Sequence, residues 1–279
     1  DKIKYFYHAG TNGIDYMTKV FSLMSANLDD LRYSNFFSDV VTSVGVGEKD
    51  YEKIQKEQSL STGGIGLSFN VLPDSTGDKF LLSAGLHGSA LRKNFSKLES
   101  LMDDTIHGFR LDEIKRLEEL TQFEIAGKEK SITQSGHILA MNGASAQISK
   151  FGAVSEFVGG VSSIHNLKTL RDSNGKIKME VLLESFSKLK SFINPVSKIE
   201  VVISASNQNF DKETTTKTGL ETLDVLNGVD LQSEEIAWIT GSDVNFCAQA
   251  FPTVGYDHPD APILTVLGAV LRNGFLHSA

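Results

Sequence analysis

Apolar and polar residues alternate strictly in two neighbouring segments of the chain, residues 65–71 and 80–86. The apolar positions are Ile65, Leu67, Phe69 and Val71 in the first segment and Phe80, Leu82, Ala84 and Leu86 in the second. A period of two is typical of a strand with one buried face. Pro73, Asp74 and Gly77 lie between the segments and favour a turn. The pattern therefore predicts a β-hairpin with one face against a core.

Much of the remaining chain has apolar residues every three to four positions, which predicts amphipathic helices that cover the hairpin. The expected helices span residues 29–44, 50–58, 91–106, 112–148 with a break near 136, 163–170, 179–189 and 261–275. Further strands are expected at residues 14–24 with apolar side chains on both faces, at 199–203 in a central position, and at 244–250. Residues 151–161 are glycine-rich and are expected to be irregular. The fold class is accordingly α+β, an antiparallel-rich mixed sheet packed against helices.

A shift in composition at residues 207–219, which are polar and rich in threonine, indicates a linker. We therefore expect an α/β domain over residues 1–210, a linker over 211–230, and the beginning of a second domain of the same type over 231–279. The last part is expected to be incomplete, because one strand and one strongly apolar helix cannot bury their own faces. Since Asp1 is not a methionine, we also expect the chain to be a piece of a longer protein.

The composition excludes several classes of partner. Of the 279 residues, 40% are hydrophobic and 22% charged, as in a soluble globular protein, and the net charge is −8. Lysine and arginine are interleaved with aspartate and glutamate, so there is no basic stripe for nucleic acid. No apolar run approaches the ~20 residues of a membrane span, and the N-terminus has no signal-peptide core. A bacterial cytoplasm and the lumen of an organelle are both compatible with these features.

The residues that could carry chemistry form no local signature. None of the seven histidines belongs to an H-E-x-x-H or H-x-x-E-H motif. The single cysteine, Cys247, excludes an internal disulfide and a cysteine-rich zinc module, and we expect a buried, unreactive thiol in the strand predicted there. The glycines of residues 63–66 and 85–88 match no phosphate-binding loop and are expected at the start of a strand and of a helix. The residues alone therefore assign no catalytic, cofactor-binding or metal-ligating position.

Three motifs occur in a distinctive order. T-N-G-I-D-Y at residues 11–16 begins a strand, and L-S-T-G-G-I at residues 60–65 leads into the hairpin. Residues 246–277 read F-C-A-Q-A-F-P-T-V-G-Y-D-H-P-D-A-P-I-L-T-V-L-G-A-V-L-R-N-G-F-L-H. This order resembles the insulinase (pitrilysin) family of zinc metallopeptidases, in its presequence-protease branch. The resemblance covers nearly the whole chain and is most specific in the last motif.

The resemblance implies an α/β-roll domain from the non-catalytic C-terminal half of such a peptidase, the third domain together with the start of the fourth. The family's first domain binds zinc through H-x-x-E-H and a more distant glutamate. Matching Val44-Gly45 to the end of the family's zinc helix replaces that motif by Phe36, Phe37, Ser38, Asp39 and Val40. An arginine–tyrosine pair that the family places beside the substrate carbonyl is also absent from this chain. The resemblance thus implies no catalytic residue and no zinc ligand here, with zinc bound elsewhere in the parent protein.

The function implied by the resemblance is that of a wall or scaffold in a zinc metalloendopeptidase that degrades short unfolded peptides, such as targeting peptides, in a closed chamber. The implied partners are the peptide substrate and the catalytic N-terminal half of the same protein. The apolar helix at residues 261–275 is expected to contact a second copy or a swapped element. An alternative is a catalytically inactive structural subunit of the processing-peptidase or respiratory core-protein type. A further alternative is an α/β domain that shares only the order of strands and helices.

Overall fold

The computed structural model describes residues 3–23, 26–74, 79–193, 199–205, 222–223, 231, 236–241, 243–255 and 257–275. Its strands are β1 (Ile3–His8), β2 (Ile14–Ser22), β3 (Ile65–Pro73), β4 (Phe80–Leu91), β5 (Ile199–Ser204) and β6 (Thr222–Leu223). Its helices are α1 (Ser34–Val41), α2 (Tyr51–Ser61), α3 (Phe95–Gly108), α4 (Ile114–Gln134), α5 (Gly136–Ala146), α6 (Lys150–Gly159), α7 (Val161–Lys168), α8 (Met179–Phe192) and α9 (Ala261–Val270). Short 3-10 turns at Asp29–Leu31 and Arg92–Asn94 precede α1 and α3.

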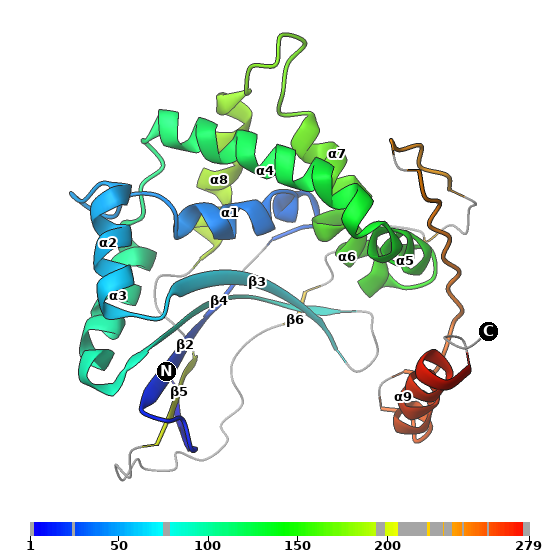
Figure 1. Ribbon diagram of the computed structural model, residues 1–279, viewed down its shortest axis with the longest axis horizontal. Coiled ribbons are helices and arrows are strands. Elements are labelled where there is room, and N and C mark those ends of the chain that lie inside the picture. Colours follow the sequence, from blue (N-terminus) through cyan, green and yellow to red (C-terminus); the bar gives the residue numbers. More distant parts are fainter. Residues whose placement is uncertain are drawn as a thin grey trace.

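One mixed sheet carries the fold, with the strand order β1-β5-β2-β4-β3. β1 and β5 are parallel, the other neighbours are antiparallel, and β6 pairs with the first residues of β4. Helices α1 to α8 lie on one face of this sheet (Figure 1). The predicted α+β class is confirmed, as is the central position of residues 199–203, which lie between β1 and β2.

The predicted hairpin is the pair β3 and β4. Leu67 pairs with Leu86 and Phe69 with Ala84 across the two strands, and the β4 side chains of this face are fully buried. β2 differs from the expectation of two apolar faces. Met17 and Phe21 are buried under the helices, whereas the alternate side chains of the strand lie on the other face and are more accessible.

Glycines at two places fix the strands in different ways. Gly64 has φ +118°, a conformation that glycine adopts without strain. It lies just before β3, at the start of a strand as the sequence predicts for this glycine cluster. Gly88 lies inside β4, so the prediction that this second cluster starts a helix is wrong. A Cβ on Gly88 would lie 2.7 Å from Cδ1 of Leu98, and the glycine therefore lets α3 pack closely on the sheet.

Two stretches of the helical layer differ from the sequence prediction. Residues 151–161 are mostly helical, forming α6, because Gly152 serves close packing and does not interrupt the helix. A Cβ on Gly152 would lie 2.3 Å from the carbonyl oxygen of Ser145, and the Gly152 N–H donates to Ser149 Oγ at 2.9 Å. The helix expected over residues 112–148 is divided into α4 and α5 at Ser135, which confirms the predicted break.

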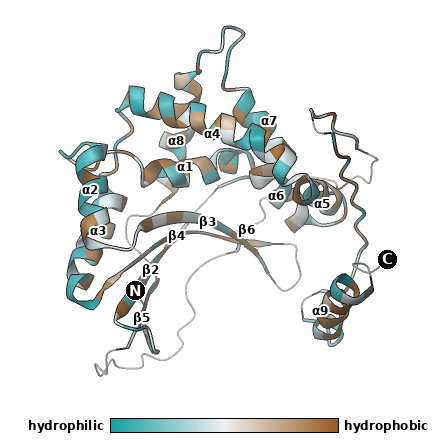
Figure 2. Cartoon of the chain, in the orientation of Figure 1, coloured by the Kyte–Doolittle hydropathy of each residue, from teal (hydrophilic) through white to brown (hydrophobic). Residues whose placement is uncertain are grey.

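The C-terminal part is less regular than the sequence predicts. Residues 244–250 form no strand, and no described strand pairs with them, so their alternating pattern has no sheet to join. Helix α9 is confirmed and continues into a π-helical turn, Leu271–Phe275. Figure 2 shows it as a largely hydrophobic helix, and none of its residues is buried. The linker predicted at residues 211–230 lies outside the described residues, apart from Thr222 and Leu223.

Within the described residues, no helix is both long enough and apolar enough to span a bilayer.

Candidate functional site at helix α1

Helix α1 is the position at which the sequence resemblance locates the counterpart of a zinc-binding motif. The helix packs against β3 and also contacts α4, α6 and α8. Phe36, Phe37 and Val40 are 3%, 0% and 0% exposed. The side chains aligned with the two histidines therefore belong to the hydrophobic core.

Aromatic rings surround α1 on the inside. The Phe37 ring lies 5.9 Å from that of Phe69, 5.7 Å from that of Phe109 and 5.2 Å from that of Phe186, measured between centroids, and all three contacts are edge-to-face. Such contacts stabilise a core through the quadrupoles of the rings. Phenylalanine and valine carry no lone pair, whereas zinc requires nitrogen, sulfur or carboxylate oxygen. The residues at this position therefore do not fit a zinc ion.

Asp39, which replaces the family's catalytic glutamate in the alignment, lies on the outer side of α1, where its side chain is only partly exposed to solvent. Its charged neighbours are Glu124 and Lys128 of α4, which pair at 3.6 Å. Partial burial raises the pKa of the Asp39 carboxyl, and the positive charge of Lys128 offsets part of this effect. Partial burial likewise raises the pKa of Glu124; Lys128 lowers it and the nearby charge of Asp39 raises it further.

This carboxyl pair predicts a pH effect on stability. The raised pKa means that the folded state holds the Glu124 proton more tightly than the unfolded chain does. The contribution of Glu124 to stability is therefore full below its ordinary pKa of 4.5 and is lost as the pH rises through the folded value. Glu124→Gln removes that loss, so the difference in unfolding free energy between variant and wild type should increase from pH 4 to pH 7.

Urea unfolding at both pH values measures this difference. Glu119→Gln is the matched control, because Glu119 is exposed on the same helix and pairs with Arg116 at 3.6 Å. An equal difference at pH 4 and pH 7 for Glu124→Gln would contradict the prediction.

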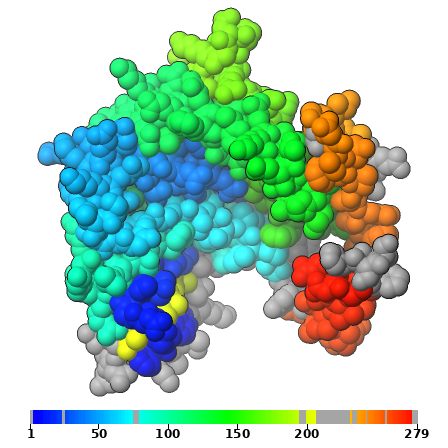
Figure 3. Space-filling view, in the orientation of Figure 1, coloured from blue at the N-terminus to red at the C-terminus, as the bar shows by residue number. Residues whose placement is uncertain are grey.

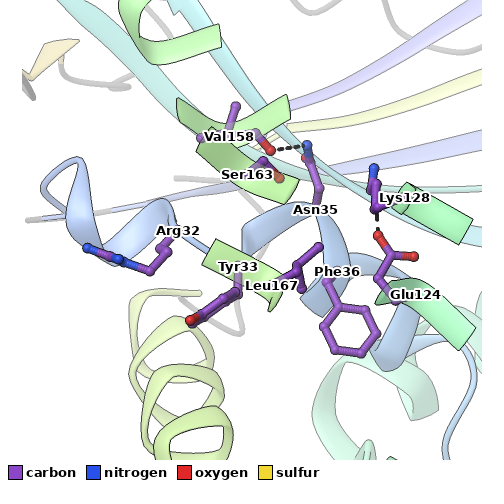
Figure 4. A pocket seen from close by; sticks show the side chains of 9 residues that line it. All are labelled: Arg32, Tyr33, Asn35, Phe36, Glu124, Lys128, Val158, Ser163 and Leu167. Carbon is purple, nitrogen blue, oxygen red and sulfur yellow. Dashed lines mark hydrogen bonds and ion pairs between the residues drawn. The ribbon is translucent and has the colours of Figure 1, made fainter. Parts of the chain in front are cut away.

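A small pocket lies at the outer side of α1 (Figure 4). Its lining consists of Arg32, Tyr33, Asn35, Phe36, Glu124, Lys128, Val158, Ser163 and Leu167. Asn35 Nδ2 donates to the carbonyl of Val158 at 2.9 Å, and Arg32 donates to Asn166 Oδ1 at 3.0 Å. The polar groups thus hold α1 to the outer helices. The lining contains no histidine or cysteine, the residue types that dominate zinc sites.

A wider depression of about 660 Å³ lies between the loop after α1 and the end of α3. Its lining is Val46, Gly47, Glu48, Lys49, Ile54, Asp103, Asp104, His107 and Gly108. Asp103 already forms an ion pair with Lys19 at 2.5 Å, and His107 Nδ1 lies 2.8 Å from the Asp103 carbonyl oxygen. Across all the residues that the structure describes, no three His, Cys, Asp or Glu side chains are grouped so that they could hold a metal.

The thiol of Cys247 is exposed, so the prediction of a buried thiol is wrong. The prediction assumed a strand at residues 244–250, and burial of alternate side chains depends on a neighbouring strand and a core beneath it. The structure describes an irregular segment at this position.

A group of buried charges on the helix-covered face of the sheet has no signal in the sequence. Lys19 of β2 and Glu200 of β5 are paired across the strands, are 3% and 1% exposed, and lie 3.7 Å apart. Asp15, 5% exposed, accepts a hydrogen bond from Ser204 Oγ at 2.7 Å. Because Lys19, Glu200 and Asp15 are engaged in these ion pairs and hydrogen bonds, we assign them a structural role.

Comparison with known proteins identifies relatives over most of the chain. The family described as associated with peptidases of family M16, subfamily C, matches residues 2–170. Mitochondrial presequence protease of Drosophila melanogaster is 25% identical over 274 residues, which cover 95% of this chain and 26% of that protein. Protein HypA of Clostridium perfringens is 25% identical over 290 residues, covering 96% of this chain and 28% of that protein. The chain thus spans about a quarter of the length of these relatives.

Solved structures superpose on parts of this chain with low scores. A conserved protein from Enterococcus faecalis V583 superposes with a TM-score of 0.48 at 8% identity, over 74% of this chain and 47% of that one. The peptidase M16 inactive domain from Pseudomonas fluorescens superposes with a TM-score of 0.42 at 11% identity, over 74% of this chain and 45% of that one. The match over residues 2–170 covers more than half of the sequence. The chain therefore belongs to the family associated with subfamily C of the M16 peptidases.

Proposed function

We propose that this chain is a non-catalytic wall of a zinc metalloendopeptidase that degrades short unfolded peptides in a closed chamber. The observation that carries the proposal is the packing of α1. The position aligned with the family's zinc motif contains Phe36, Phe37 and Val40, all buried in an aromatic core. The zinc and the general base would be supplied by the N-terminal half of the same parent protein.

The family match supports this assignment. Two relatives whose alignments cover at least 95% of this chain are mitochondrial presequence proteases. In the proposed parent, residues 1–210 form the third α/β domain, residues 211–230 a linker, and residues 231–279 the beginning of the fourth domain. The exposed helix α9 would then be covered by later parts of that domain, because an apolar helix is stable in water only when its face is packed.

The face of the sheet opposite helices α1 to α8 supports a role as a wall. Tyr7, Ile203 and Tyr16 lie side by side on β1, β5 and β2, and are 55%, 36% and 44% exposed. Large side chains in a row across neighbouring strands provide contact area without requiring a particular peptide sequence. Such a surface suits a chamber that selects extended peptides by size and lets many sequences pass.

The first test uses this chain alone. We expect no tight stoichiometric zinc binding in calorimetric titration, and no cleavage of an unfolded peptide, because α1 offers aromatic and aliphatic groups where ligands would be needed. A single tight zinc site, or peptide cleavage that a chelator abolishes, would contradict the proposal.

The second test uses the full-length parent. Its coding sequence should contain H-x-x-E-H upstream of Asp1 and an arginine and a tyrosine downstream of Ala279. Substituting the glutamate of that motif should abolish peptide hydrolysis, whereas Asp39→Asn should leave kcat essentially unchanged, because a carboxylate outside the catalytic site makes no contact with the transition state. A parent that has the length of two domains and lacks the motif would favour the structural-subunit alternative.

A further inference from the structure

The segment that leads to α9 contacts the helical layer through an aromatic side chain. Phe246 is half-buried, whereas its neighbours Val244 and Cys247 are exposed. The Phe246 ring lies 6.4 Å from the ring of His137, at the beginning of α5. In Figure 3 this segment (orange) lies against the end of the helical layer formed by α5 (green).

Gly136 provides the surface on which the ring rests. A Cβ at this position would lie 2.2 Å from Cδ2 and 2.3 Å from Cε2 of Phe246, so the ring occupies the space in which any other side chain would begin. Positive φ does not explain the glycine, because the residues with φ above zero are others. Glycine is also a poor helix former, so its presence at the first position of α5 disfavours the helix unless close approach compensates.

A second glycine of the same helix shows the difference. Gly143 of α5 has open space where its Cβ would lie, with no atom within 4 Å. Close approach of a side chain is therefore a property of position 136 and not of the glycines in this helix generally.

We propose that Gly136 and His137, at the junction of α4 and α5, form a docking site for Phe246. Docking fixes the course of residues 243–255 beside the helical layer and so determines where the chain enters α9. In the peptidase proposed above, the contact would set the position of the fourth domain relative to the third. The docking itself does not depend on that function.

The chain supplies its own reporter for this contact. Cys247 is the only cysteine, it is exposed, and it follows Phe246 directly. A nitroxide spin label on Cys247 therefore reports how strongly the segment is held, without any added cysteine. A label beside a docked ring gives a motionally restricted spectrum, whereas a released segment gives a mobile one.

Four variants separate docking from general effects. Phe246→Ala removes the ring, and Gly136→Ala fills its site while favouring the helix. Gly143→Ala is the control for the second change, and Phe251→Ala, at a ring that is 70% exposed, is the control for the first. Circular dichroism of each variant shows whether the fold is retained, and Phe246→Ala alters no buried core residue.

We expect the ratio of restricted to mobile label to fall about fivefold in Phe246→Ala and in Gly136→Ala, as for loss of a half-buried phenyl ring. Wild type and both controls should keep the restricted component. An unchanged spectrum in Phe246→Ala would overturn the proposal, as would equal effects of Gly136→Ala and Gly143→Ala. Because the readout is label mobility, its failure would leave the peptidase assignment intact, and failure of the zinc and cleavage tests would leave the docking result intact.

Discussion

Replacing Phe37 by alanine should lower the free energy of unfolding by about 4 kcal/mol, the range found for large-to-small changes at buried aromatic positions. The Phe37 side chain is 0% exposed and contacts the rings of Phe69, Phe109 and Phe186. Phe69 belongs to β3, Phe109 directly follows α3, and Phe186 belongs to α8. A cavity at this point would therefore loosen the sheet and two helices together. The neighbouring rings are held by their own elements and can fill only part of the space.

Urea unfolding followed by circular dichroism measures this effect. Phe123→Ala is the matched control, since Phe123 is 74% exposed on α4 and its removal should change stability by less than about 0.5 kcal/mol. Comparable losses in the two variants would show that α1 does not have the central packing role described above. A large loss of stability in Phe37→Ala alone would support the conclusion that hydrophobic core residues occupy the position aligned with the family's zinc motif.

Lys19→Met should cost about 3–5 kcal/mol of stability, because it removes the buried cationic partner of a buried carboxylate. Lys19 Nζ lies 2.5 Å from Asp103 Oδ1 and 3.7 Å from Glu200 Oε1. Asp103 is half-exposed and can be solvated, but the Glu200 side chain is 2% exposed. Lys4 Nζ also lies 3.8 Å from Glu200 Oε2, but the Lys4 side chain is 40% exposed, so its charge is better screened by water than that of Lys19.

A double variant separates pairing from packing. In Lys19→Met with Glu200→Leu, no charge remains at the pair, and much of the lost stability should return because apolar residues of similar volume replace it. Lys53→Met is the control, since Lys53 is 69% exposed and pairs with Asp50 at 3.3 Å. If Lys19→Met alone is as mild as Lys53→Met, or if the double variant is worse than the single one, the ion pair does not have the proposed role.

These two experiments address the main structural features that could be mistaken for chemistry. Residues of α1 align with a zinc-binding motif of the family. The charged residues around Lys19 are buried, as the charged residues of an active site often are. Aromatic contacts explain the first and ion pairing explains the second. The helix-covered side of the sheet thus provides stability, while the proposed peptide contacts lie on its other face.

The predictions that succeeded rest on side-chain periodicity. The hairpin of β3 and β4, the strand β5 and helices such as α3 and α8 follow from apolar spacing, because one buried face imposes a period of two or 3.6 on the sequence. Phe36 and Val40 lie in the helix predicted over residues 29–44 and are buried. The family resemblance rested on motif order and agrees with the match over residues 2–170.

The failures share a different cause. β1 is an edge strand whose neighbour, β5, lies almost two hundred residues later, and no local pattern announces that pairing. The alternation at residues 244–250 is a genuine strand pattern, but a strand forms only with a partner, and no described strand adjoins it. Gly152 of α6 looked like a helix breaker because its close packing against Ser145 of α5 cannot be seen along the chain.

The sequence by itself determined which residues face inward, the order of most strands and helices, the family, and the absence of a metal-binding motif in this chain, since each of these is written in local spacing or motif order. Only the tertiary structure decided which charges are buried together, which glycines permit close approach, and where the ring of Phe246 rests. Those features depend on atoms far apart in the chain, and burial, pairing and contact arise only when the fold brings them together.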